Sequence, residues 1–282
     1  MKKTLTIMML LSSLVWAQTE KKEIVKKGWS PGVLPVVAYN SDLGLEYGAL
    51  LNLVNFGDGS AYPNYFSKIY LEASQYTKGS GIYRIYYDAP QFYRNIRLIA
   101  DLSYLPDRAY DFFGFNGYES VYNTDWEDQD APTYKSRVFY KYDRDFLRVK
   151  ADLQGKVGDS PLKWTGGITG QNFKISSVDV ERLNKGKDEA DKLPDVEGLY
   201  DKYVRWGLIG ADEKDGGLVL TLKGGLVYDT RDVIANPGKG VWTEAVVVSS
   251  SKTVGSDFDF AKIALTHRQY FTLLPNRLTF AY

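Results

Sequence analysis

Apolar and polar residues alternate along most of this chain with a period of two. In the clearest segment, residues 146–154, the apolar positions are Leu147, Val149, Ala151 and Leu153, and the polar ones are Arg148, Lys150, Asp152 and Gln154. This alternation is typical of a β-strand with two unlike faces. A series of strands with hydrocarbon on one face and charge on the other indicates a sheet between lipid and water.

The same pattern predicts about a dozen strands. They are expected at 33–40, 43–56, 67–76, 82–88, 97–104, 136–142, 146–154, 162–173, 203–209, 218–229, 241–248, 258–271 and 277–282. Two long polar segments, 106–134 and 176–202, interrupt the series. The longer strands match the roughly 9 to 11 residues that cross an outer membrane. We therefore predict an all-β fold, an antiparallel transmembrane β-barrel; a secreted soluble β protein is the alternative.

The segment 218–248 predicts a hairpin by its turn chemistry. Its first arm ends in Asp229, Arg231 and Asp232, and its turn contains Pro237 and Gly240. Proline fixes φ and glycine permits a positive φ, so both are structural candidates. Asp229 and Arg231 share a face, where they pair with each other or with groups in the lumen. In the alternative interpretation they are a charge cluster that ends the strand and satisfies the hairpin backbone.

The N-terminus has the pattern of an export signal. Lys2 and Lys3 precede an apolar run, and Val15 and Ala17 supply a small-residue cleavage site, so residues 1–17 are expected to be a signal peptide. An uncleaved anchor helix is less consistent with an apolar run shorter than the ~20 residues that span a bilayer. Residues 18–32 are then a short periplasmic lead-in, and residues 33–282 form the barrel.

Composition narrows the choice of partners. The chain has 35 acidic and 35 basic residues and no cysteine. Balanced charge gives no reason to expect nucleic acid as a partner. The absence of cysteine excludes disulfides and cysteine-based metal sites. Aromatic residues make up 15% of the chain, which suits aromatic girdles at the two membrane interfaces.

No group of residues predicts catalysis, a cofactor or a bound metal. His267 is the only histidine, and its neighbours suggest neither a catalytic triad nor a metal site. The acidic segment 125–130 lacks the spacing of a calcium loop. Asp257 and Asp259 suit a phospholipase-like site in principle, but no serine with a nearby histidine accompanies them. We therefore expect a protein that is not an enzyme.

Three stretches resemble a known family. DTRDVIANPGKGVWTEA, at 229–245, and FDFAKIALTHRQYFTLLPNRLTFAY, at 258–282, resemble the barrel of the BamA/TamA superfamily (bacterial surface antigen family). The opening KKGWSPGVLPVVAYNSDLGLEYGALLNLVNFGDG is similar to a barrel-only subgroup found in Bacteroidota. The resemblance implies a Gram-negative outer-membrane protein that assembles, inserts or translocates other proteins. Its partners would be outer-membrane lipid, client outer-membrane proteins and other subunits of the assembly machinery.

The sequence departs from the family pattern in two ways. The short lead-in cannot form the periplasmic POTRA repeats that usually precede the barrel, and the Arg-Gly-aromatic motif of the family's lid loop has no counterpart. Because the family's barrel has sixteen strands, we expect a C-terminally truncated sequence; a complete smaller barrel is the alternative. A second function also stays open, a passive porin-like channel whose water path is lined by Arg148, Lys150 and Asp152.

Overall fold

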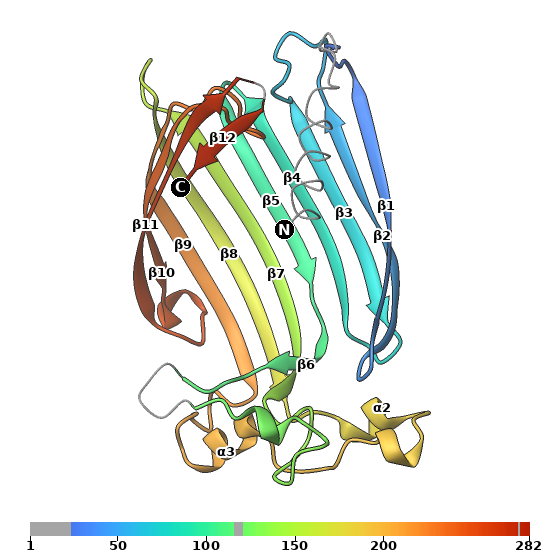
Figure 1. Ribbon diagram of the computed structural model, residues 1–282. Helices are drawn as coiled ribbons and strands as arrows, with labels where there is room; N and C mark the ends of the chain where they lie inside the picture. The colour runs from blue at the N-terminus through green and yellow to red at the C-terminus, as the bar shows by residue number, and fades with distance from the viewer. Residues whose placement is uncertain (1–23, 116–120, 276) are drawn as a thin grey trace, which may run out of the picture.

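The chain forms one curved antiparallel sheet. The computed structural model describes residues 24–115, 121–275 and 277–282, and the predicted signal peptide lies outside them. Twelve strands make up the sheet, which wraps around a hollow (Figure 1). The strands are β1 (Trp29–Asn40), β2 (Gly44–Asn55), β3 (Ser67–Tyr76), β4 (Gly81–Tyr93), β5 (Ile96–Tyr104), β6 (Asp107–Asp111), β7 (Lys141–Lys156), β8 (Leu162–Ser176), β9 (Gly216–Asp229), β10 (Gly240–Ser250), β11 (Phe260–Leu274) and β12 (Leu278–Ala281). The predicted all-β antiparallel fold is confirmed.

Strand order follows the sequence, except that β6 pairs with β7 off the main path. Every pair of neighbouring strands is antiparallel, including β5–β7 and β8–β9, which are joined by long connections rather than by short hairpins. β1 begins at Trp29, so residues 29–32 of the predicted lead-in belong to the sheet. Among the described residues no helix has the length and apolarity needed to cross a membrane.

The two ends of the sheet carry different connections. At the short-turn end, β4–β5 and β7–β8 are joined by residues 94–95 and 157–161. At the opposite, long-loop end, two long excursions join β5 to β7 and β8 to β9; their described residues, 105–115, 121–140 and 177–215, are drawn below the strands in Figure 1. The excursions include η1 (Thr124–Trp126), α2 (Val180–Asn184), η2 (Glu189–Asp191) and α3 (Leu199–Arg205); η3 (Lys252–Val254) lies in the β10–β11 connection.

The described parts of the long loops pack together into a cap against the hairpins of the long-loop end. Val138, Leu183 and Leu193 form its small buried core. Asp42, in the β1–β2 hairpin, accepts hydrogen bonds from Arg137 at 2.8 Å and from Lys187 at 2.8 Å. Burial alone would raise the pKa of Asp42, but these two cationic partners outweigh burial and hold the pKa below its ordinary value. The charges therefore fasten both excursions to the edge hairpin.

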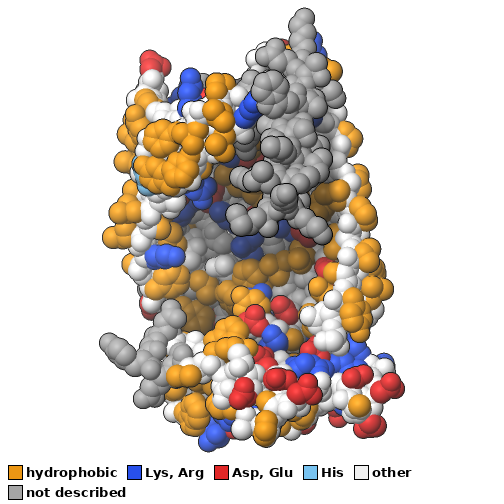
Figure 2. Space-filling model, viewed as in Figure 1, with side chains coloured by type: hydrophobic (Ala, Val, Ile, Leu, Met, Phe, Trp, Pro, Cys, Tyr) orange, Lys and Arg blue, Asp and Glu red, His pale blue; other side chains and the backbone are white. Residues whose placement is uncertain are grey.

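The two faces of the sheet differ in chemistry. The outer face is apolar: on β7, Leu147, Val149 and Leu153 are 41%, 55% and 41% exposed. The inner face, which lines the hollow, carries the charged residues that alternate with them. Figure 2 shows hydrophobic side chains along the flanks of the sheet and charged ones within. Exposed aromatic side chains stand near both ends of the strands, among them Tyr104 at the long-loop end and Tyr93 at the short-turn end.

Two predicted strands are wrong. Residues 136–140 form a turn that buries Phe139 and Tyr140, and β7 begins only at Lys141. The predicted strand at 203–209 is instead the end of helix α3 and a turn. Tyr200 and Tyr203 are spaced for one helix face, and both rings meet Phe112, at centroid distances of 5.3 and 5.2 Å. Packing against this aromatic side chain favours the helix over an alternating strand.

Candidate functional site

A network of ion pairs crosses the inner face through Asp101 on β5. Arg84, on β4, donates to one carboxylate oxygen at 2.6 and 2.9 Å, and Arg148, on β7, donates to the other at 2.9 and 3.1 Å. Ser103 donates a further hydrogen bond at 2.6 Å. The Asp101 side chain is only 4% exposed. Its charge is thus shared by two arginines, which ties three strands together.

Asp152 holds a second part of this network. Lys150, on the same strand, lies 2.9 Å away, and Lys223, on β9, lies 2.5 Å away. Lys223 reaches across β8 because Gly167 stands opposite Asp152 there. A side chain at Gly167 would place its Cβ 2.0 Å from Asp152 Oδ1. Glycine is therefore needed for this close approach.

The structure pairs the two hairpin charges that the sequence singled out. Arg231 donates to both oxygens of Asp229, at 2.9 and 3.1 Å. Lys163, on β8, donates to the same carboxylate at 2.9 Å. Asp229 thus pairs with its neighbour and also with a second group on the inner face. The cluster also lies at the end of β9.

Asp232 and Gly240 shape the turn itself. Asp232 accepts hydrogen bonds from the backbone N–H groups of Val233, Gly238 and Lys239, at 2.9, 3.0 and 3.3 Å. Burial would raise the pKa of Asp232, but these backbone donors outweigh it and lower the pKa. Gly240 has a φ of +107°, which side chains rarely adopt. Pro237 lies in the same turn.

A cavity of about 500 Å³ lies on the inner face at the short-turn end. It brings together Lys150, Asp152 and Arg231, which the sequence placed in two separate groups; Arg148 is not part of its lining. The β9–β10 connection meets the β2–β3 connection over it, through a hydrogen bond from Ile234 N to Asn64 Oδ1 at 3.0 Å. The two connections belong to distant strands, so this contact spans the hollow.

Several cavity residues were missed by the sequence analysis. Arg97, Lys223, Trp242, Glu244 and Arg268 all line it. Their alternation with apolar residues was a usable signal for the face on which they lie. Which of them meet depends on strand register and curvature, and neither follows from one strand's pattern.

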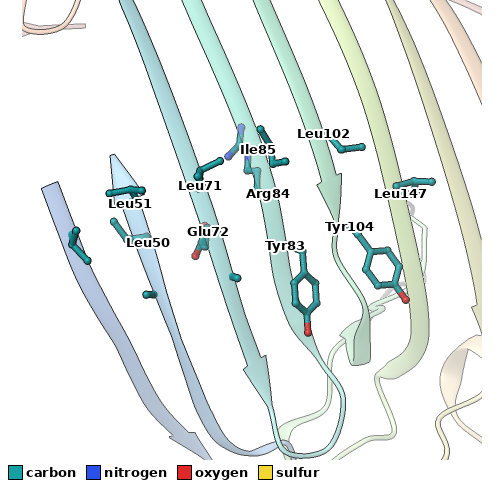
Figure 3. Close-up of a pocket in the computed structure, with 13 residues that line it drawn as sticks. Leu50, Leu51, Leu71, Glu72, Tyr83, Arg84, Ile85, Leu102, Tyr104 and Leu147 are labelled. Atoms are coloured by element: carbon teal, nitrogen blue, oxygen red, sulfur yellow. The ribbon is translucent and has the colours of Figure 1, made fainter. Parts of the chain in front are cut away.

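A second hollow, of about 570 Å³, lies on the outer face over strands β1 to β5 and β7 (Figure 3). Small residues, Ala49 and Ala73, leave it open, and leucine and isoleucine side chains surround it. Tyr83 and Tyr104 stand side by side at one end, with ring centroids 6.0 Å apart. Its apolar lining belongs to the face that we predicted to meet lipid.

Strand β1 has one free edge within the part of the chain that the structure describes. It pairs with β2 along its whole length and with no other described strand. Gly28 N donates a hydrogen bond to Gly57 O, and Phe56 N donates one to Gly28 O. Because backbone groups alternate in direction along a strand, the N–H and C=O groups of even-numbered β1 residues point toward β2. The backbone groups of odd-numbered residues point away from β2, toward the edge, and Pro31 and Pro35 are odd-numbered. The edge therefore lacks two of its backbone donors.

The residues weighed for catalysis have structural partners. His267 Nδ1 lies 2.8 Å from the hydroxyl of Thr243, its cross-strand neighbour. Asp257 accepts from the backbone N–H of Leu218 at 2.6 Å, and Asp259 accepts from that of Lys252 at 2.7 Å. The two carboxylates thus order the β10–β11 connection and its neighbouring strand.

Comparison with known proteins identifies the family. A family model, the Omp85 superfamily domain, matches residues 95–282. The chain belongs to the Omp85 superfamily. This confirms the BamA/TamA resemblance and the transmembrane-barrel class, and Omp85 proteins are outer-membrane proteins.

One solved structure similar to this chain is BamA from Haemophilus ducreyi lacking POTRA domains 1–3, with a TM-score of 0.44 and 17% identity. The match covers 89% of this chain and 38% of that one. A search among curated proteins finds no match.

Proposed function

We propose that this Omp85 barrel helps to insert or translocate other proteins at the outer membrane. The observation that carries the proposal is the edge of β1 that faces away from β2, with which no other described strand pairs. An unpaired edge offers a row of backbone groups to an incoming strand, the mode of recognition called β-augmentation. Membership of the Omp85 superfamily agrees with a role for this edge in the membrane.

The backbone groups on this edge favour pairing with a client strand that is later released. Val33, Val37 and Tyr39 present backbone donors on it, whereas Pro31 and Pro35 interrupt the row. In hydrocarbon an unpaired backbone group costs several kcal/mol, so a client strand gains by pairing there. The two missing donors weaken the pairing, which favours release of the client once its own strands have paired.

The test measures folding and contact together. The purified chain is reconstituted in liposomes, a urea-unfolded outer-membrane protein is added, and its folding is followed by heat-modifiable migration in gels. Because the chain has no cysteine, Val37→Cys introduces a single thiol for crosslinking to a cysteine-bearing client. Leu147→Cys, on the outer face of the internal strand β7, is the matched control.

We expect faster client folding than in protein-free liposomes and crosslinks at Val37 that exceed those at Leu147. Equal crosslinking at the two positions would refute the edge as the contact. Unchanged folding rates would refute the assembly function itself.

A passive channel is the second candidate, because the inner face is polar and encloses a cavity. Planar bilayer recordings separate the two functions. Large stable conductance steps indicate a channel, whereas small flickering steps fit the assembly barrel.

A further inference from the structure

The inner-face cavity has an excess of positive charge. Its lining includes six cationic side chains, Lys68, Arg97, Lys150, Lys223, Arg231 and Arg268, and three carboxylates, Asp88, Asp152 and Glu244. The chain as a whole is neutral, with 35 residues of each sign, so this excess is local. We propose that the cavity is a binding site for an anionic group, a carboxylate or a phosphate.

Some of the cations are already neutralised. Arg97 pairs with Asp88 at 2.6 Å, and Arg231 pairs with Asp229 at 2.9 Å. Asp152 serves two lysines at once, Lys150 and Lys223. One carboxylate cannot balance two ammonium groups, so this part of the wall keeps a net positive charge.

Two further cations are without a carboxylate. Across the described ranges, no Asp or Glu lies within ion-pair distance of Lys68 or Arg268. Both nevertheless line the cavity. Their donors are therefore available to a ligand, and a guanidinium matches the two oxygens of a carboxylate or phosphate.

Trp242 positions two of the arginines. The guanidinium carbon of Arg268 lies 5.1 Å from the ring centroid of Trp242, and that of Arg231 lies 5.9 Å from it. Arg268 is also the direct cross-strand partner of Trp242. The indole thus keeps guanidinium groups from β11 and from the β9–β10 turn beside one cavity. Because Trp242 lines the cavity, its fluorescence should respond to a ligand that binds there.

The cavity is also shaped to concentrate anions. In Figure 2, Lys and Arg side chains gather inside the hollow of the sheet. The hydrogen bond between Ile234 and Asn64 joins two loops that cover the cavity at the short-turn end. A concave site lined mainly by one sign of charge, with protein walls, focuses the field and raises the local concentration of counter-ions.

Collisional quenching of Trp242 tests the proposal on the full chain in detergent micelles. Iodide is the anionic probe, caesium the cationic one and acrylamide the neutral one, all at constant ionic strength. The difference between the chain and its Trp242→Phe variant isolates the signal of this tryptophan from the others. We expect iodide to quench Trp242 about tenfold more effectively than caesium, the lower end of enrichment in such clefts. Equal quenching by the two ions would overturn the proposal.

Charge variants locate the site. Arg268→Gln and Lys68→Gln are each expected to lower iodide quenching of Trp242 severalfold and to leave acrylamide quenching unchanged. Lys262→Gln is the matched control, because it removes a charge from the same strand and the same face as Arg268 but lies outside the cavity lining. An equal effect of Lys262→Gln and Arg268→Gln would show general surface charge and would also overturn the site.

Competition identifies the source of the anion. Inorganic phosphate and acetate are added against iodide in one arm, and micelles that contain an anionic phospholipid are used in the other. Protection by the free ions indicates a soluble ligand, and protection by the phospholipid alone indicates a headgroup. No protection in either arm would contradict a built site. None of these readouts depends on protein insertion.

Discussion

The charge network predicts a large loss of stability for Asp101→Asn. The substitution keeps the size of the side chain but removes the negative charge that Arg84 and Arg148 share. Both arginines then remain on the inner face without their counter-charge. The Asp101 side chain is 4% exposed, whereas those of Arg84 and Arg148 are 37% and 27% exposed.

The magnitude follows from this burial. Removing one partner of a fully buried ion pair costs about 3–5 kcal/mol. Water reaches both arginines in part, which compensates some of the lost charge, and an asparagine oxygen still accepts a hydrogen bond. We therefore expect a decrease of about 2–3 kcal/mol in the free energy of unfolding.

Guanidinium unfolding of the purified barrel in detergent micelles measures this decrease as a lower midpoint with an unchanged slope. Asp111→Asn is the control, because Asp111 pairs with Lys141 on β7 but its side chain is 59% exposed. Such a pair contributes at most about 1 kcal/mol. If Asp101→Asn destabilises the barrel no more than Asp111→Asn does, the shared carboxylate does not hold the inner face together.

Three further predictions concern other parts of the chain. The pKa of Asp42 is lowered in the folded state, so its stabilising effect is present above about pH 4 and is lost as pH falls through the folded pKa; the protection of residues 177–215 against hydrogen exchange, corrected for the intrinsic rate at each pH, should fall over that range and, at pH 7, in Asp42→Asn. Pro35→Ala restores an edge donor and should increase client crosslinking at Val37→Cys; an unchanged yield would mean that the donor row does not matter. Gly240→Ala forces a side chain to a φ of +107° and should cost about 1–3 kcal/mol in denaturant unfolding, whereas Gly224→Ala, with nothing within 4 Å, should cost well under half as much.

Strand alternation was sufficient to predict most of the sheet. β3 has the predicted bounds, and most other strands were found to within a few residues, because a face in lipid and a face in water leave a strict period of two. The errors fall in the long loops, where this constraint is absent. There Tyr200 and Tyr203 bury themselves against aromatic neighbours that lie far away in the sequence, such as Phe112.

The sequence also predicted which strand and face each charged residue occupies, but not the residue with which it forms an ion pair. Arg148, Lys150 and Asp152 could be assigned to one face, yet Asp101, the partner of Arg148, and Lys223, the second partner of Asp152, lie on other strands. The meeting of Lys223 and Asp152 depends on Gly167, one strand away from both. Such contacts follow from register, which a single strand's pattern does not determine.

Asp42 links the long-loop end of this molecule to its edge strand β1. The hairpin that contains Asp42 is the direct continuation of β1, and it is clamped by Lys187, a residue 145 positions further along the chain. A binder that moves Lys187 away from Asp42 would break this ion pair. The hairpin would then be held less firmly, and the hydrogen bonds at the neighbouring end of β1 would open more often. An antibody fragment raised against residues 177–215 would then alter strand addition without touching the strand itself.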